Sequence, residues 1–325
     1  MSTKIIDKLI YVCISIQQSV NFNLMKKSIL LTICFFCYLF SNAQSNEAYI
    51  KSIDIWHEVR IENLKQPNGW LNLEGLFWLH KGKNTLGQAN GNDCKYINPS
   101  PADVFFPDHL GDFMYEGDSV VWVGNEKYPV TINKQLVSGS NPTLAFKQEV
   151  NNIAFEWSHF SWNIIKREDK VGVRFRNLQS LNILHFSGIE RFAVDSKWRV
   201  KAILNPPTQD FLMISNVLGQ ITPSKNAGRL SFSLDGKAYS LDVIDEGGET
   251  LFITFADETA GKTTYGAGRF IEVVRPDAQG NTIIDFNIAY NPPCAFTEFA
   301  TCPLPPVQNR LSIAITAGEK NYGHH

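Results

Sequence analysis

The sequence has no local pattern that marks a known catalytic or metal site. Its seven histidines form no HxH or HxxxH pair, the spacings at which neighbouring side chains hold a metal. No serine stands in a GxSxG turn, and GAGRF at 266–270 is not followed by the Gly-Lys-Ser/Thr of a phosphate loop. Charge runs and repeats of fixed period are also absent. These absences exclude the most easily recognised metalloenzymes, esterases and nucleotide-binding proteins.

An excess of positive charge is also missing. The net charge is −2 and the pI is about 6.4, so the chain lacks the basic face that a nucleic-acid partner requires. With 44% hydrophobic and 19% charged residues in 325, the chain can bury one large core or two ordinary ones. We therefore expect a globular protein without a nucleic-acid partner.

No apolar run reaches the length of a membrane span. The longest one, residues 29–40, has about 12 residues where a span needs about 20. It follows Met25 and two lysines and precedes the small residues 41–43, which is the layout of a secretory signal peptide. We expect residues 1–24 to be a non-native extension and residues 25–44 a cleaved signal peptide. The mature protein would then be periplasmic or secreted, with no stable membrane span.

The remaining sequence predicts a mainly β protein with antiparallel sandwich or barrel architecture and one N-terminal helix. Residues 46–64 have helical spacing of apolar residues, and nearly everything after Trp70 alternates apolar and polar residues between turn signals. The clearest hairpins turn at 116–118, 168–169 and 235–236. Further strands are expected at 70–79, 142–148, 152–158, 251–256, 268–274, 282–290 and 310–317. We predict a helix and sandwich-like half over 45–204, a proline-rich connection over 205–228 and a C-terminal sheet over 229–325.

Residues 289–311 form a stiff loop that contains five of the fifteen prolines and two of the six cysteines. Proline prevents a helix or a central strand there, while the aromatic residues argue against a mobile linker. Because an exported protein meets an oxidising compartment, we expect a disulfide between Cys294 and Cys302 and a free, remote Cys94. Free thiols at 294 and 302 would instead favour a nucleophilic or metal-binding role.

Polar residues before this loop could form a ligand site. Asp285, Asn287 and Asn291 share one face of the strand expected at 282–290, and Arg269 lies in the glycine-rich stretch TYGAGRF. That face could be solvated, or it could be the floor of a pocket under the loop. Likewise, Arg269 could grip an anionic ligand or pair with Asp285 as a structural ion pair.

Three blocks resemble a known family: TYGAGRF, DFNIAYNPPCAFTEFATCPLPPVQNRL and GWLNLEGLFWLHKGKNTLG. They are similar to the signature blocks of an uncharacterised bacterial family, a domain of unknown function, over about Trp56 to Glu319. The resemblance carries no activity. It implies that ten residues occupy family motif positions: Tyr265, Arg269, Asp285, Asn287, Tyr290, Asn291, Cys294, Cys302, Asn309 and Arg310. Separately, LHKGKNTLG resembles the opening turn of forkhead-associated domains, but Gln88 replaces their phosphate-holding arginine, so only a sandwich fold is implied.

Two hypotheses about function follow. In the first, a small polar or anionic ligand binds in a pocket beside the loop and is hydrolysed by acid and base groups, with Asp285, Tyr265 and Tyr290 as the catalytic residues. Arg269, Asn287, Asn291 and Arg310 would then bind the substrate. In the second hypothesis the protein is not an enzyme, and its aromatic, proline-stiffened surface binds a peptide or glycan at the cell envelope. No cofactor is indicated by the sequence.

Overall fold

The computed structural model describes residues 46–99, 105–137, 140–147 and 153–323. The predicted extension and signal peptide lie outside these residues. A helix occupies residues 46–65, close to the predicted bounds, and strands dominate from residue 73 onward, so the predicted fold class is confirmed. No helix in the described ranges combines the length and apolar character needed to cross a membrane.

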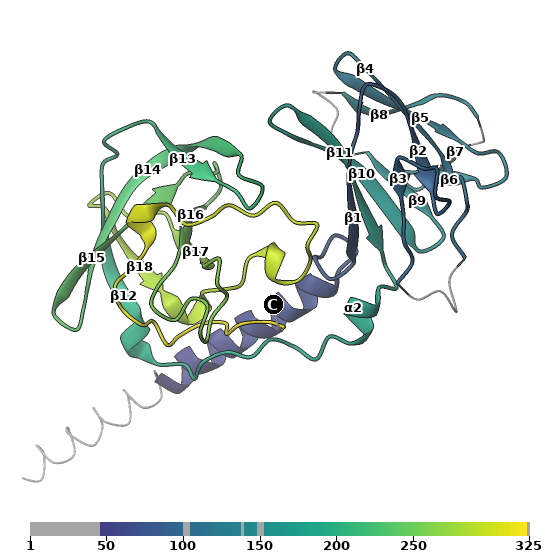
Figure 1. Cartoon of the computed structure of the whole chain (residues 1–325). Coiled ribbons are helices and arrows are strands. Elements are labelled where there is room, and N and C mark those ends of the chain that lie inside the picture. The colour runs from purple at the N-terminus through teal and green to yellow at the C-terminus, as the bar shows by residue number, and fades with distance from the viewer. Residues whose placement is uncertain (1–45, 100–104, 138–139, 148–152, 324–325) are drawn as a thin grey trace, which may run out of the picture. The chain divides into compact units, whose positions relative to one another are not determined.

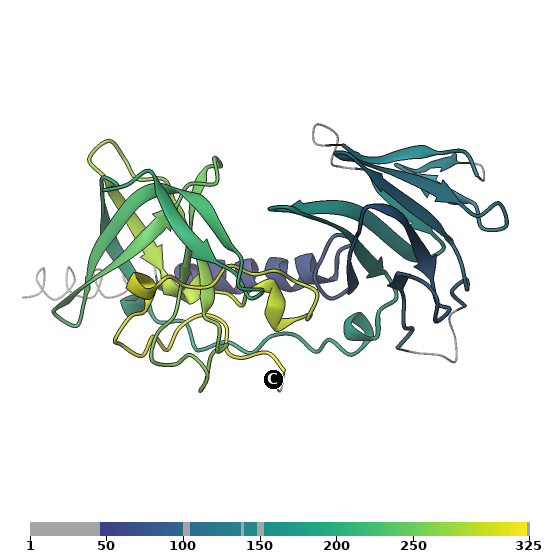
Figure 2. The ribbon, with the colours of Figure 1, turned by 45° about the horizontal axis from the view of Figure 1, so that its top comes forward.

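The first half of the chain after the helix is a sandwich of two sheets (Figures 1 and 2). The six-stranded sheet has the order β1 (Leu73–Trp78), β11 (Lys170–Asn177), β10 (Phe160–Arg167), β9 (Ala154–Trp157), β6 (Val130–Ile132) and β7 (Gln135–Val137). The five-stranded sheet has the order β3 (Cys94–Lys95), β2 (Gly82–Gly87), β4 (Gly111–Glu116), β5 (Ser119–Gly124) and β8 (Thr143–Lys147). All pairs are antiparallel except β2 with β3.

Aromatic residues from both sheets fill the space between them. Trp122 of β5 lies 5.3 Å from Trp162 of β10 between ring centroids, and Phe155 stacks on Trp162 at 5.8 Å. These rings are buried because alternate residues of each strand point inward. The sandwich therefore has a core of its own, as both the strand pattern and the forkhead-associated resemblance predicted.

Residues 178–198 lead from the sandwich to the second half of the chain and contain α2 (Leu181–Leu184) and η1 (Ser196–Trp198). The second half is a nearly closed barrel in the order β17 (Arg269–Val274), β16 (Thr250–Phe255), β15 (Lys237–Ile244), β14 (Ile221–Leu234), β12 (Arg199–Asn205) and β18 (Asn281–Asp285). β13 (Phe211–Ser215) pairs with β14 outside this path. Thr282 Oγ1 donates to the Val274 carbonyl at 2.8 Å and thereby joins β18 to β17.

The three predicted hairpins are confirmed. They are formed by β4 with β5, β10 with β11, and β14 with β15. Their turn residues Gly117, Glu168, Asp235 and Gly236 all have positive φ, from 49° to 76°. Turn residues and alternation act locally, and for that reason the sequence reveals these hairpins.

Three predicted segments differ from the structure. Residues 205–228 are not a strand-free connection, because they contain β13 and the start of β14, with Pro206 and Pro207 in the turn before β13. The strand predicted at 282–290 ends at Asp285, where η2 (Phe286–Ile288) begins. Residues 311–317, predicted to be a strand, run without regular structure, and their backbone instead satisfies buried side chains described below.

Candidate functional site

Arg269 is buried inside the barrel, where no ligand reaches it. Its Nη2 donates to Asp257 Oδ2 at 3.0 Å and to the Ile315 carbonyl at 3.1 Å, and Nη1 donates to the Ala317 carbonyl. The Arg269 and Asp257 side chains are each 1% exposed. These contacts favour a structural role for Arg269 over the predicted role in substrate binding, and its ion pair is formed with Asp257 instead of Asp285.

Asp285 and Asn287 stabilise a chain reversal at the end of β18. Asp285 Oδ1 accepts hydrogen bonds from the Asn287 backbone N–H and from Asn287 Nδ2, both at 3.1 Å, and so caps η2. Asn287 also exchanges two hydrogen bonds with the backbone of Asp195. Arg199 Nε lies 3.7 Å from Asp285 Oδ2. These contacts favour an architectural role for both residues.

Asn291 and Tyr290 lie beside a second buried carboxylate, Glu319. Its Oε2 accepts from the Asn291 backbone N–H at 2.6 Å, and its Oε1 lies 3.3 Å from Arg60 Nε. Arg60 also donates to the Asn291 carbonyl at 2.9 Å and lies over the Tyr290 ring, 4.8 Å from its centroid. Burial raises the pKa of Glu319, while Arg60 and the Asn291 N–H oppose that shift. Asn291 thus ties the loop to the chain near residue 320.

Tyr290 forms part of a small pocket. Its hydroxyl donates to Glu272 Oε1 at 3.2 Å, and burial, followed by the Glu272 charge, raises the pKa of Tyr290. The pocket has a volume of about 250 Å³ and is lined by Trp56, Val59, Arg60, Asn63, Glu272, Ile288 and Tyr290. At neutral pH the tyrosine is therefore a hydrogen-bond donor and not a base. Arg310, the last predicted ligand-binding residue, is exposed.

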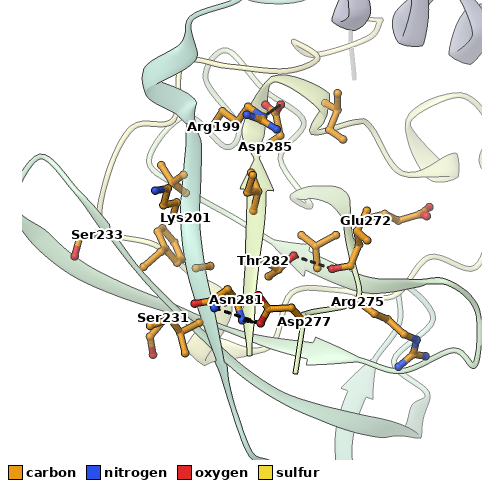
Figure 3. A pocket seen from close by; sticks show the side chains of 18 of the residues that line it. Arg199, Lys201, Ser231, Ser233, Glu272, Arg275, Asp277, Asn281, Thr282 and Asp285 are labelled. Atoms are coloured by element: carbon orange, nitrogen blue, oxygen red, sulfur yellow. Dashed lines mark hydrogen bonds and ion pairs between the residues drawn. The ribbon is translucent and has the colours of Figure 1, made fainter. Parts of the chain in front are cut away.

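A wider groove of about 1450 Å³ lies over β12 and β18 (Figure 3). Arg199 and Asp285 stand at one end of it, and Asp277 and Asn281 at the other, where Asn281 Nδ2 donates to Asp277 Oδ2 at 3.1 Å. Arg275 on its rim pairs with Asp245. Because these charges compensate one another, the groove offers no clear preference for a ligand of either sign.

The two cysteines of the loop do come together. Cys294 lies in η3 (Pro293–Ala295), which begins at a proline, and its backbone N–H donates to Cys302 Sγ at 3.0 Å. Both are free thiols, as is Cys94, so the predicted disulfide is absent from the structure although the predicted proximity is confirmed. The Cys302 sulfur accepts this backbone hydrogen bond, and the two sulfurs are not joined by a covalent bond.

The two thiols have different environments. Cys294 is half-buried, whereas Cys302 is 3% exposed. A hydrogen bond from the Cys302 thiol lowers the pKa of Cys294 against the effect of burial, and the Tyr265 hydroxyl assists. The same pairing, together with burial, raises the pKa of Cys302. Cys294 is therefore the thiol of the pair that loses its proton more readily, and the thiolate is the nucleophilic form of cysteine.

Three larger side chains lie near the two cysteines: Tyr265, Trp70 and Arg174. The Tyr265 hydroxyl donates to the Cys294 carbonyl at 3.1 Å, and burial raises the pKa of this tyrosine. Trp70 and Cys294 both pack against the buried cluster that contains Cys302, and the guanidinium carbon of Arg174 lies 5.2 Å from a Trp70 ring centroid. Arg174 Nε is buried without a hydrogen-bond partner. A positive charge near a thiol favours the thiolate.

Sequence reasoning assigned none of these contacts to Asp257, Glu319, Arg60 and Arg174, which complete them. Asp257 stands close to TYGAGRF in the sequence, but Arg60 and Arg174 are far from that motif and nothing local connects them to it. Within the described part of the chain, no three His, Cys, Asp or Glu side chains are grouped so that they could hold a metal.

Comparisons with known proteins add a family but no activity. Residues 184–320 match the model of a family described as protein of unknown function, DUF1684, and this segment includes the barrel, Tyr265 and both loop cysteines. The family match begins at residue 184, whereas the resemblance described from the sequence began at about Trp56. No curated protein matches the chain. One similar solved structure is the solution NMR structure of an uncharacterized protein from Haloarcula marismortui, with 31% identity over 43% of this chain and 80% of that chain and a TM-score of 0.37.

Proposed function

We propose, for a chain whose residues 184–320 belong to the DUF1684 family, that its function is thiol–disulfide exchange at Cys294 and Cys302. The observation that carries the proposal is the proximity of one half-buried and one buried thiol, with the Cys294 backbone N–H donating to Cys302 Sγ at 3.0 Å. An accessible thiol with a lowered pKa beside a buried second thiol is the arrangement that attack and resolution require.

The reaction needs a partner that carries a disulfide. The Cys294 thiolate attacks one sulfur of the partner, forms a mixed disulfide and releases the partner's other sulfur as a thiolate, which takes up a proton. The Cys302 thiol then loses its proton and attacks Cys294 Sγ, which forms the Cys294–Cys302 disulfide and releases the second partner sulfur. Two electrons pass to the partner, whose disulfide becomes two thiols. The reverse sequence oxidises a partner dithiol.

The surrounding residues have supporting roles in this scheme. Tyr265 donates to the Cys294 carbonyl and lowers the pKa of the Cys294 thiol, whereas the Arg174 charge lowers the pKa of Cys302 and so favours deprotonation of the thiol that attacks second. The hydrolytic mechanism expected from the sequence finds less support, since Asp285 caps η2 and Tyr290 binds Glu272. Export through a signal peptide at 25–44 remains part of the proposal and is tested by N-terminal sequencing of the secreted protein.

Alkylation of the folded protein tests the proposal. We expect iodoacetamide to modify Cys294 at least about tenfold faster than Cys302 or Cys94, because reactivity follows thiolate content and exposure. Cys94 is the matched control, since it is buried and burial raises its pKa to about 12. Mass spectrometry of tryptic peptides after timed quenching would give the three rates.

Glutathione disulfide provides the second readout. Wild-type protein should form the Cys294–Cys302 disulfide and release glutathione, whereas Cys302→Ser should accumulate a mixed disulfide at Cys294. Cys294→Ser should form neither species, and Cys94→Ser should behave as wild type. Equal alkylation of all three thiols, or no linkage between residues 294 and 302 after oxidation, would refute the proposed function.

A further inference from the structure

β13 has a free edge next to the proline-rich loop. Asn216 N–H donates to the Gln220 carbonyl at 2.9 Å, and Asn226 N–H donates to the Asp210 carbonyl at 2.9 Å. Because bonded positions alternate along an antiparallel pair, even-numbered residues of β13 bond to β14 and odd-numbered residues face away. The backbone N–H and C=O groups of Phe211 and Met213 are thus directed to the open side, where no hydrogen bond to them occurs in the described chain.

The loop pairs with only the C-terminal end of this edge. Leu304 N–H donates to the Ser215 carbonyl at 2.7 Å, and Val217 N–H donates to the Cys302 carbonyl at 3.1 Å. Residue 303 stands opposite residue 216 in an antiparallel bridge, so the continued register would bring Pro306 opposite Met213. Proline has no N–H to give to the Met213 carbonyl, and the ladder stops there.

A groove of about 440 Å³ lies where the loop leaves the strand. It is lined by Gln209, Leu212, Met213, Ser215, Leu304, Pro305, Pro306, Val307, Gln308 and Arg310. The edge sequence FLMIS has no charged residue and no proline, which are the usual protections of an exposed edge. Phe211 is 54% exposed, Met213 61% and Val307 83%.

We propose that this edge binds an extended peptide of another protein, which adds a strand beside β13. Backbone donors and acceptors at strand spacing are chemically specific for another polypeptide backbone. The continuing loop fixes the position of that strand, because it already supplies the first rungs of the same ladder at residues 302–304. Residues 305–308 line the other side of the groove, so the space beside β13 is wide enough for one added strand. A second copy of the chain would have to bring its whole sheet to this edge, and residues 305–308 stand in its way.

The bound segment has a predicted chemistry. It is extended, has no proline at the positions opposite Phe211 and Met213, and presents apolar side chains to the apolar groove wall at Leu212 and Pro305. This inference is independent of the thiol chemistry proposed above, because it uses no cysteine side chain.

The test uses octapeptides selected from a random phage-displayed library on the purified chain and then made with a fluorescent label. Met213→Pro removes one edge donor and no bond to β14, since Met213 stands opposite Pro223 in a pair that is not hydrogen-bonded. We expect this variant to bind the selected peptides about tenfold more weakly. Met213→Ala keeps the backbone donor and should bind within about threefold of wild type.

A second variant keeps the test valid if Met213→Pro fails to fold. Pro306→Ala restores an N–H opposite Met213, which lets the loop occupy the edge and should also weaken peptide binding. Amide hydrogen exchange at Met213 should be fast in the free chain and slow with bound peptide. Unchanged affinity in both variants, or an unprotected Met213 amide in the complex, would overturn the proposal. It would also be overturned by a wild-type dimer that Met213→Pro converts to monomer, since the edge would then bind a second copy.

Discussion

Arg269 and Asp257 form an ion pair in the interior of the barrel, with Nη2 and Oδ2 3.0 Å apart and both side chains 1% exposed. Asp257 also accepts hydrogen bonds from the Ile315 N–H at 2.9 Å and from Thr259. Each charge therefore has several protein partners and is almost completely removed from solvent. Arg269, the charged residue of the TYGAGRF block, therefore stabilises the barrel interior.

Removal of one charge should be costly. We expect Arg269→Met to lower the free energy of unfolding by about 3–5 kcal/mol, because Asp257 would remain as a buried charge without its counterion. Urea unfolding followed by tryptophan fluorescence measures this loss. Lys197→Ala is the control, since Lys197 and Asp195 are 59% and 48% exposed, and it should cost less than about 1 kcal/mol. Similar losses in the two variants would contradict the structural role.

Two glycines of the TYGAGRF block should respond differently to alanine. Gly268 has a φ of +95°, and a Cβ there would lie 2.5 Å from the Phe255 carbonyl oxygen and 2.6 Å from Pro305 Cγ. Gly268→Ala should therefore cost about 2 kcal/mol or more in the free energy of unfolding.

Gly266→Ala is the matched control, because the nearest atom to its Cβ would be Gly261 Cα at 3.6 Å, an ordinary contact. Its stability should stay within about 1 kcal/mol of wild type. Thermal unfolding of the two variants decides between these outcomes, and equal melting temperatures would show that the close approach at Gly268 is unimportant.

Stability should depend on pH through Glu319. Burial raises the folded-state pKa of this carboxyl above its ordinary value, so the folded chain holds the proton more tightly than the unfolded chain. Its contribution is complete below the unfolded pKa of about 4.3 and is lost as the pH rises through the folded pKa.

Glu319→Gln keeps an acceptor for the Asn291 N–H and stays neutral at every pH. The unfolding free energy of this variant relative to wild type should therefore rise between about pH 4 and the folded pKa. Urea midpoints at successive pH values measure the difference. Glu62→Gln, at a carboxylate that is 64% exposed, is the control and should follow wild type. A constant difference for Glu319→Gln would contradict the assignment.

Asn309 should matter for stability because its buried side chain bonds to three backbone groups. Its Nδ2 donates to the Asp242 and Thr254 carbonyls, each at 2.9 Å, and its Oδ1 accepts from the Asp242 N–H at 2.7 Å. Asn309→Ala leaves these buried backbone groups without partners and should cost about 3 kcal/mol in urea unfolding. The neighbouring Gln308 is exposed and makes one side-chain hydrogen bond, from Nε2 to Asp242 Oδ2 at 2.7 Å, so Gln308→Ala should cost only about 1 kcal/mol, and the reverse order would refute this account.

Most of the fold could be predicted from local sequence patterns, namely turn residues and the alternation of apolar and polar residues. Alternation with Asp235-Gly236 predicted the β14–β15 hairpin because turn and strands lie within a few residues of one another. The same alternation misled at 282–290, where Ile284 and Phe286 continue a strand pattern although Asp285 caps a turn. The alternation of apolar and polar residues cannot predict this cap, because the cap depends on hydrogen bonds between the Asn287 side chain and the backbone of Asp195, which is distant in sequence.

The site was only partly predictable for a similar reason. Cys294 and Cys302 are eight residues apart in a proline-stiffened loop, so their proximity followed from the sequence. The partner of Arg269 did not, because Asp257 and the carbonyls near residue 316 reach it only after the barrel has closed. Polar residues in one motif block thus had separate structural partners, and the pattern alone could not separate them from a shared ligand site.

The irregular segment 311–317 affects the order in which the two halves of the chain can fold during synthesis. Its carbonyls at Ile315 and Ala317 and its N–H at Ile315 complete the shell around Arg269 and Asp257, which are encoded about fifty codons earlier. A nascent chain that stops before residue 315 leaves the Arg269–Asp257 pair without these backbone partners, so we expect the barrel to close stably only after this segment has emerged from the ribosome. The sandwich, whose core lies within residues 79–175, has no such requirement and can fold first.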